Sequence, residues 1–312
     1  MARLQQAVDK WEGLLSATSG AIVPEKTYWY LIDFCWQGGT LRYCSIDERP
    51  GTLSALDITG VRKDIRRVEV DSAEETLGIF IAPSGCMKGE IKKLKKVVQQ
   101  WIANLAQGKL SRQEMWIAAR STIWRTLSYP LPALNISNTQ WDDILSPLIR
   151  FLLPALGVCR NFPRSLVFAP AKFFGLELMH LYTAQEIARL KDIVFHMANG
   201  TVTGDLYTSS LELLFIEMGC FLPLGQASFS IWGELVSPSL IKSTWSFLDC
   251  YGLELHTDIT LELPREDDCF IMTRIQECTS NSTHLIWINQ CRLFLKALFL
   301  SDLVDGAGKF IL

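Results

Sequence analysis

Apolar residues in the first 81 positions follow a helical period and then an extended one. Six of them recur every three or four residues and predict an amphipathic helix that ends near Gly20: Leu4, Ala7, Val8, Trp11, Leu14 and Leu15. From Tyr28 to Phe34 an extended chain would be apolar on both faces, which predicts a central strand. Gly38-Gly39 and Pro50-Gly51 then punctuate shorter apolar runs. We therefore predict a small antiparallel β meander over about residues 28–81.

From residue 86 onward the apolar period is helical. A stripe from Met87 to Leu105 predicts a lysine-rich helix over 87–107, and Ser111-Arg112-Gln113-Glu114 is a capping box that starts the next helix. Three further helices are predicted from their start signals: one from Thr139, one from a capping box at Thr183-Ala184-Gln185-Glu186, and one from Ser237-Pro238 to Cys250. Three more are predicted over 205–218, 264–278 and 284–303. The predicted fold class is therefore α+β, mainly α.

Three regions follow from these patterns. Residues 1–85 hold the predicted strands, residues 86–221 form a basic helical region, and residues 222–312 form an acidic helical region. The segment 222–236, rich in Leu, Pro, Gly and Ser, is the predicted linker.

Charge is distributed unevenly along the 312 residues, although the net charge is only −3. Residues 86–191 carry 15 Lys and Arg against 6 Asp and Glu, whereas residues 192–312 carry 6 against 15. A basic middle region is typical of a protein that binds a polyanion. The alternative interpretation is a solvated helix face with no partner.

Nine cysteines are dispersed, and none forms a CxxC pair. This pattern predicts reduced thiols in an intracellular protein, cytoplasmic or nuclear and not secreted. A zinc site is not expected, because zinc needs several convergent ligands. The sequence shows no signal peptide and no run of 18 apolar residues, so no membrane partner is predicted.

Generic catalytic motifs are absent from the sequence, which has no glycine-rich phosphate loop, HExxH or GxSxG. Two aspartate pairs, Asp142-Asp143 and Asp267-Asp268, could in principle hold Mg²⁺. Both follow helix-start signals, so we interpret them as first-turn residues that favour the positive end of a helix dipole.

Basic and aromatic residues alternate from Cys159-Arg160-Asn161-Phe162-Pro163-Arg164 to Lys172-Phe173-Phe174. Cationic side chains neutralise phosphates and flat rings stack on bases, so the segment is a candidate nucleic-acid contact. The alternative is an amphipathic connector whose rings fill the core.

Several segments in order resemble one family. Trp11–Gly20 with Pro24-Glu25-Lys26-Thr27-Tyr28-Trp29, Thr76-Leu77-Gly78-Ile79-Phe80-Ile81, Gly157–Arg164 and Asn289–Leu298 are similar to the end of the palm, the thumb and the following region of a reverse transcriptase. The closest likeness is to non-long-terminal-repeat retrotransposons, in particular the retrotransposon-like open reading frames of algae and diatoms. No single motif is specific, and the ordered set carries the resemblance.

The resemblance implies a role for individual residues. Lys26 would be a palm lysine acting as general acid toward pyrophosphate, and Leu77 and Gly78 would form a primer grip. The helices from 87 to 107 and from Ser111 would be a thumb that contacts a template–primer duplex by shape and phosphate. The predicted nucleic-acid-binding residues are Lys88, Lys92, Lys93, Lys95, Lys96, Arg112, Arg120, Arg160 and Arg164.

The family's metal-binding aspartates have no counterpart in this sequence, because the resemblance begins just after the catalytic hairpin. We therefore expect a truncated reverse-transcriptase-like protein that does not polymerise as an isolated chain but binds RNA or DNA duplexes non-specifically. No cofactor is expected in this chain, since Mg²⁺ would belong to a missing N-terminal catalytic half. The alternative is a helical interaction or structural protein, or a degenerate retroelement product.

Overall fold

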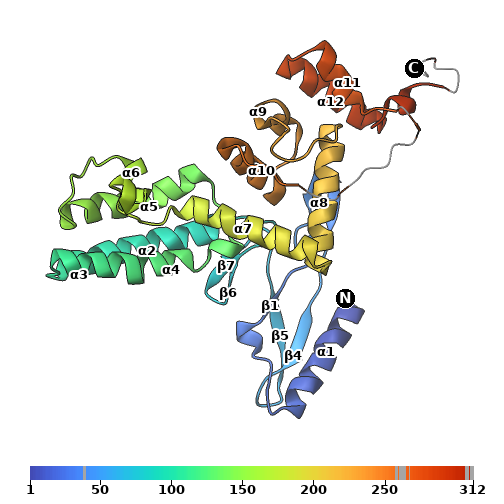
Figure 1. Cartoon of the computed structure of the whole chain (residues 1–312). Coiled ribbons are helices and arrows are strands. Elements are labelled where there is room, and N and C mark those ends of the chain that lie inside the picture. The colour runs from blue at the N-terminus through green and yellow to red at the C-terminus, as the bar shows by residue number, and fades with distance from the viewer. Residues whose placement is uncertain (38–39, 257–258, 260–264, 267, 306–308, 310–312) are drawn as a thin grey trace. The chain divides into compact units, whose positions relative to one another are not determined.

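The computed structural model describes residues 1–37, 40–256, 259, 265–266, 268–305 and 309. The chain forms two compact units, Met1–Arg164 and Ser165–Leu312, and the boundary between them falls inside the predicted region 86–221. Helices dominate both units, and the strands that the structure describes lie in the first (Figure 1). This confirms the predicted α+β, mainly α class.

Short strands make three small sheets in the first unit. The strands are β1 (Tyr28–Trp29), β2 (Phe34–Gln37), β3 (Thr40–Tyr43), β4 (Leu53–Leu56), β5 (Arg62–Arg67), β6 (Glu74–Thr76) and β7 (Ile79–Ile81). The largest sheet has the order β1-β5-β4, and the other two are the hairpins β2-β3 and β6-β7. All pairs are antiparallel except β1 with β5, which is parallel.

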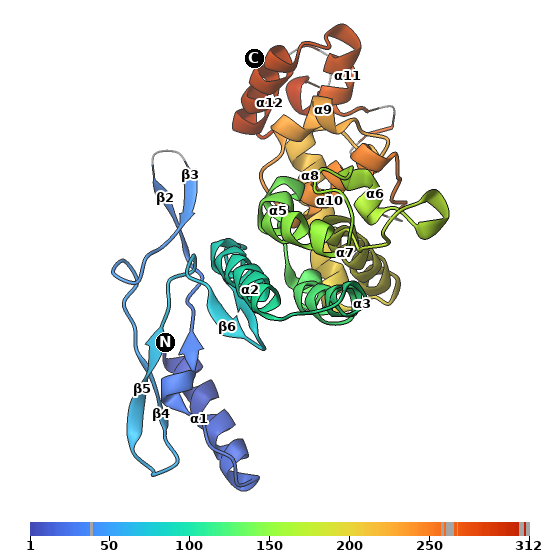
Figure 2. The same ribbon diagram turned by 90° about the vertical axis from the view of Figure 1, so that its left-hand side faces the viewer.

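A small core joins the N-terminal helix to the three-stranded sheet. Helix α1 (Ala2–Ala17) lies against β4, as Figure 2 shows. Trp29, Leu53 and Ile65 are buried there with Ala55. The long central strand predicted from Tyr28 to Phe34 is wrong. Only Tyr28 and Trp29 pair with β5, and Ile32 is more than half exposed, so no second apolar layer covers the middle of that segment.

The helical part of the first unit packs α2 (Lys88–Gln107) against α5 (Asn138–Ala155). In the chain between α2 and α5 come α3 (Arg112–Ile117) and α4 (Trp124–Ser128), which are joined by a π-helical turn, η2 (Ala118–Ile123). The capping box at Ser111 is confirmed, because its hydroxyl accepts from Glu114 N–H and the Glu114 carboxylate accepts from Ser111 N–H. A second box starts α5 at Ser137.

The second unit is helical around one core cluster that includes Phe215, Trp232 and Trp245. Its helices are α6 (Arg164–Phe168, which begins at the boundary), α7 (Leu181–Ala198), α8 (Val202–Met218), α9 (Phe229–Trp232), α10 (Leu240–Tyr251), α11 (Ile271–Cys278) and α12 (Ser282–Leu295). Short 3-10 turns complete the described chain: η1 (Pro24–Lys26), η3 (Leu131–Ala133), η4 (Ala171–Phe173), η5 (Gly233–Leu235) and η6 (Leu300–Leu303).

Several predicted boundaries in the second unit are wrong. Helix α7 begins at Leu181, so Thr183 is not an N-cap, and its hydroxyl instead contacts His180 Nδ1 at 2.7 Å. The N-cap of α10 is Ser239 rather than Ser237. The predicted linker 222–236 is not an exposed connector, because it buries Leu224 and Trp232 in the core.

The last two helices are shorter than predicted. Helix α11 begins at Ile271, whereas residues 264 and 267 of the predicted helix lie outside the described residues. Helix α12 ends at Leu295 because Lys296 takes a left-handed conformation, with a φ of 57°. In the described residues no helix is long and apolar enough to cross a membrane.

Candidate anion-binding site

The C-terminal half of α5 places Arg150 on the outer side of the helix. Its neighbours Leu148, Ile149 and Leu152 are buried, so the helical period turns the Arg150 guanidinium toward solvent. The helix is followed by Gly157, whose φ of +74° suits a residue without a Cβ. Val158 N–H donates to Leu153 O at 2.8 Å in this turn, which sends the following loop back alongside the helix.

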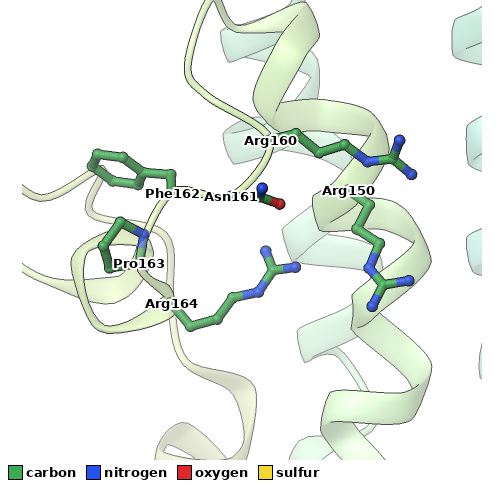
Figure 3. A pocket seen from close by; sticks show the side chains of 6 residues that line it. All are labelled: Arg150, Arg160, Asn161, Phe162, Pro163 and Arg164. Atoms are coloured by element: carbon green, nitrogen blue, oxygen red, sulfur yellow. The ribbon is translucent and has the colours of Figure 1, made fainter.

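An open pocket of about 690 Å³ lies between this loop and α5. Its lining residues are Arg150, Arg160, Asn161, Phe162, Pro163 and Arg164. In Figure 3 the Arg164 side chain reaches from the loop toward α5, while Arg150 and Arg160 project on the same side. One helix end and one loop thus bring together arginines that are up to 14 residues apart in the sequence.

The electrostatic character of the pocket is cationic. Among the residues that the structure describes, no Asp or Glu lines it, and none of the three arginines has a salt bridge within 4.0 Å. Arginine presents a planar fork of N–H donors that matches phosphate and carboxylate oxygens. The arrangement can therefore bind an oxyanion with charge-assisted hydrogen bonds.

A neighbouring hollow of about 780 Å³ shares Arg150 and Arg160 and adds Asp143 together with the apolar flank of α5. Asp143 is an exposed residue in the N-terminal half of that helix. Asp143 places one negative charge beside the arginines in this second hollow. The second hollow is therefore less cationic than the arginine pocket.

Arg112 lies at the base of the same loop. A Cβ added to Gly157 would lie 1.9 Å from Arg112 Nη2, so the guanidinium occupies the space that glycine leaves open. Arg112 is not one of the residues that line the pocket. Its charge nevertheless lies against Gly157, which precedes Arg160 by three residues in the chain.

The predicted lysines form a separate group on α2. Lys88, Lys92, Lys95 and Lys96 are exposed and recur at i, i+4, i+7 and i+8, which places them on one stripe of the helix. Lys93 faces the sheet instead. Its ammonium contacts the Gly78 carbonyl and lies 3.5 Å from a carboxylate oxygen of Glu75. These lysines do not line the arginine pocket.

Arg120 is exposed on the π-helical turn, with its guanidinium 6.0 Å from the centroid of the Trp116 ring. This cation–π distance is at the outer limit of a favourable contact. Arg120 is therefore partnered with its own helix and is not among the pocket residues.

The Leu77-Gly78 pair is a hairpin turn between β6 and β7. Both residues have positive φ, 50° and 80°, as a type I′ turn requires, and Leu77 is 86% exposed. Tyr129 donates its hydroxyl hydrogen to Leu77 O at 2.9 Å, which fixes the turn to the end of α4. The turn is therefore held by a helix of the same unit.

Lys26 lies exposed at the end of η1, two residues before the Tyr28 strand. The hydroxyl of Tyr28 hydrogen-bonds that of Thr76, next to Leu77. The Tyr28 strand and the Leu77-Gly78 turn are thus adjacent. Whether they grip a primer stays a prediction.

Asp142 and Asp143 do not lie on a hairpin between strands, as a metal site of the polymerase type would require. Asp142 and Asp143 lie in helix α5 as predicted, but beyond its first turn, because the helix already begins at Asn138. Asp268 accepts hydrogen bonds from Cys269 N–H at 2.9 Å and Ser301 N–H at 3.2 Å, and Asp267 lies outside the described residues.

One other group of ligand-type side chains stands out. Within the described ranges, Cys35, Cys44 and Glu48 are the one group of three that lies close enough to share a metal ion. The sequence indicated no such group, because the two cysteines are nine residues apart and form no CxxC motif.

Sequence reasoning missed Arg150, which contributes to both hollows on α5. A signal was present, since Arg150 is the one charged residue in the segment 144–156, which is otherwise apolar except for Ser146. The family likeness gains no independent support, because comparison with models of known protein families, with curated proteins and with solved structures found no match to this chain.

Proposed function

We propose that the first unit binds the phosphate backbone of nucleic-acid duplexes, as the thumb of a reverse-transcriptase-like protein would. The observation that carries this proposal is the meeting of Arg150, Arg160 and Arg164 around one open pocket, whose described lining residues include no carboxylate. Clustered guanidiniums repel one another, so an arrangement of this kind is most favourable when an anion lies between them.

The lysine stripe of α2 is a second, separate group of cations in the same unit. Lys88 and Lys96 are eight residues apart, which corresponds to about 12 Å along a helix. A duplex carries one charge per about 1.7 Å of its axis, so four lysines over this length meet several phosphates. Contacts of this type position a backbone and read no sequence.

Polymerisation is not part of the proposed activity of this chain alone. Phosphoryl transfer needs carboxylates that present Mg²⁺ to the triphosphate, and Asp142 and Asp143 are exposed on a helix instead of a hairpin. Lys26 alone supplies no charge stabilisation at a metal.

The test is fluorescence anisotropy with a labelled RNA–DNA duplex over a series of salt concentrations. We expect the logarithm of the affinity to fall linearly with the logarithm of salt, because bound phosphates release counterions. The triple variant Arg150→Gln/Arg160→Gln/Arg164→Gln should bind more weakly and lower the magnitude of the salt slope by roughly 2 to 3.

The matched control is Arg3→Gln/Lys10→Gln/Lys109→Gln, which removes the same charge from exposed positions of the same unit. It should leave the salt slope close to that of the parent chain. Binding that does not depend on salt, or an equal loss in both triple variants, would contradict a specific role for the arginine pocket.

A second candidate function is a protein-interaction role, favoured by exposed aromatic residues of the first unit. Trp36 on β2 is 74% exposed and Trp11 on α1 is 58% exposed. Aromatic side chains are enriched at protein–protein interfaces, and each of these rings is available for such a contact. Sedimentation velocity distinguishes this candidate, since Trp36→Ser should then change the assembly state and leave duplex binding intact.

A further inference from the structure

Three ligand-type side chains converge at the base of the β2–β3 hairpin. The sulfur atoms of Cys35 and Cys44 and a carboxylate oxygen of Glu48 all lie within 4.8 Å of one another. Cys44 is buried, Cys35 is half-buried and Glu48 is exposed, so the group opens to solvent on the Glu48 side.

The register of the hairpin explains why the two thiols meet. Cys35 is paired with Arg42 across the ladder, and Cys44 N–H donates to Asp33 O at 2.9 Å one step further along. Cross-strand partners share a face of the sheet, and residues two apart on a strand return to the same face. Cys35 and Cys44 are therefore diagonal neighbours on one face, as a shared ligand requires.

Glu48 is oriented toward this group by hydrogen bonds. Its Oε2 accepts from Ser45 N–H at 2.9 Å, from the Ser45 hydroxyl at 3.2 Å and from Arg42 Nη1 at 2.7 Å, whereas Oε1 accepts from Arg42 Nη2. Each carboxylate oxygen has two lone pairs, so Oε1, with one donor, keeps a position for a metal ion. Carboxylates that ligate metals are usually held by such an outer partner.

We propose that Cys35, Cys44 and Glu48 bind a thiophilic divalent cation of the zinc class, with a water molecule as fourth ligand. Each thiol loses its proton to solvent when the cation binds, and the two thiolates and the carboxylate then carry three negative charges. The cation supplies two positive charges and Arg42 the third, which leaves the group neutral. The proposal does not depend on nucleic-acid binding.

The ligand chemistry selects the class of cation. Thiolate sulfur is a soft ligand that favours zinc-like ions, whereas Mg²⁺ and Ca²⁺ require oxygen ligands. The three ligand atoms already lie within 4.8 Å of one another, so one tetrahedral ion can reach all of them and would join β2, β3 and the turn at 45–48. The consequence is a metal cross-link that stabilises the hairpin.

The experiment is a titration of the reduced full chain with Zn²⁺ in competition with a chromophoric chelator, repeated with Co²⁺. We expect one equivalent of tightly bound metal and, with Co²⁺, a thiolate-to-metal charge-transfer band. Cys35→Ser, Cys44→Ser and Glu48→Gln should each weaken binding at least about tenfold. The control Cys159→Ser/Cys278→Ser changes two exposed thiols elsewhere and should bind like the parent chain.

Circular dichroism verifies that each variant is folded, and Cys35→Ser, at the half-buried position, keeps the test valid if Cys44→Ser unfolds. The proposal is overturned if the reduced chain binds no metal, if Cys35→Ser retains full affinity, or if the control loses as much. Mass spectrometry of the unreduced chain adds one outcome. A Cys35–Cys44 disulfide, with no metal bound after reduction, would overturn the metal site and make the pair a thiol–disulfide couple instead.

Discussion

The carboxylate of Glu90 accepts a hydrogen bond from the backbone N–H of Phe80 at 2.8 Å and thereby joins the first turn of α2 to strand β7. Glu90 is only 1% exposed, so its carboxylate is shielded from water. Its partners are the Phe80 N–H and the Lys93 ammonium, which lies 3.8 Å from Oε2. The same lysine contacts the Gly78 carbonyl. One helix turn thus holds the β6–β7 hairpin in place.

Replacing Glu90 by Ala should destabilise the first unit. The change leaves the Phe80 N–H without its acceptor and opens a small void, and the expected loss is about 1–3 kcal/mol of unfolding free energy. Glu90→Gln keeps an acceptor oxygen and should lose less. Urea denaturation measures the difference, and equal midpoints for Glu90→Ala and the parent chain would refute the structural role.

Gly157→Ala should weaken the arginine site as well as the fold. A Cβ at this position would displace Arg112, whose Nη2 lies 1.9 Å from it, and the positive φ adds strain of about 1–2 kcal/mol. Gly85→Ala is the matched control, because Gly85 has a φ of +76° and a Cβ added there would meet no atom within 4 Å. In thermal unfolding, the midpoint temperature of Gly157→Ala should be lower than that of Gly85→Ala. The reverse order would contradict the steric argument.

The buried ion pair of α7 gives a third prediction. Arg189 and Glu186 are 3% and 1% exposed and are joined at 2.8 Å. Burial lowers the pKa of Arg189, and the Glu186 carboxylate opposes that effect. Arg189→Met leaves a buried carboxylate without this partner and should lose about 3–5 kcal/mol of unfolding free energy.

The double variant Glu186→Gln/Arg189→Met removes both charges and should be less destabilised than Arg189→Met alone. Denaturant unfolding of the two single variants and the double variant measures the coupling. Strict additivity would show that the two side chains do not interact.

The pH dependence of the first unit should include a contribution from Glu48. Hydrogen bonds from Arg42 and from Ser45 N–H lower the pKa of Glu48 from 4.5 to about 2. A folded pKa below the unfolded one gives stability that is present above the unfolded pKa and is lost as pH falls toward the folded value. Unfolding measured from pH 5 to pH 2 should therefore show a steeper decline for the parent chain than for Glu48→Gln, and parallel curves would exclude this contribution.

Local signals predicted the parts of the fold that depend on nearby residues. The stripe from Met87 to Leu105 gave helix α2, and the capping box at Ser111 started α3 where expected, because both depend on contacts within one or two turns. The predicted Tyr28–Phe34 strand failed for the opposite reason. A strand needs a partner, and β5 extends only far enough to pair with Tyr28 and Trp29.

The candidate site was predicted in part. Arg160 and Arg164 were identified from the alternation of basic and aromatic residues, but their convergence with Arg150 depends on the turn at Gly157. Lys93 looked equivalent to its neighbours in the sequence, and only the position of the β6–β7 hairpin distinguishes it. The proximity of the two hairpin thiols depends on strand register, which no spacing rule for CxxC motifs detects.

The π-helical turn Ala118–Ile123 has a consequence for how the chain tolerates changes in length. The backbone hydrogen bonds of a π turn span one residue more than those of an α turn. The helical segment 112–128 therefore contains one residue more than a continuous α-helix would need to connect the same two ends. Loss of one residue here would restore an α-helix and keep Met115 and Leu127 in their buried phases. Loss of one residue inside α2, which has no π turn, would rotate the part of the helix after the deletion by about 100° relative to the part before it. Lysines and core residues on opposite sides of the deletion would then no longer keep their relative positions around the helix. Natural variation in length is therefore expected to concentrate at the π turn and to avoid α2.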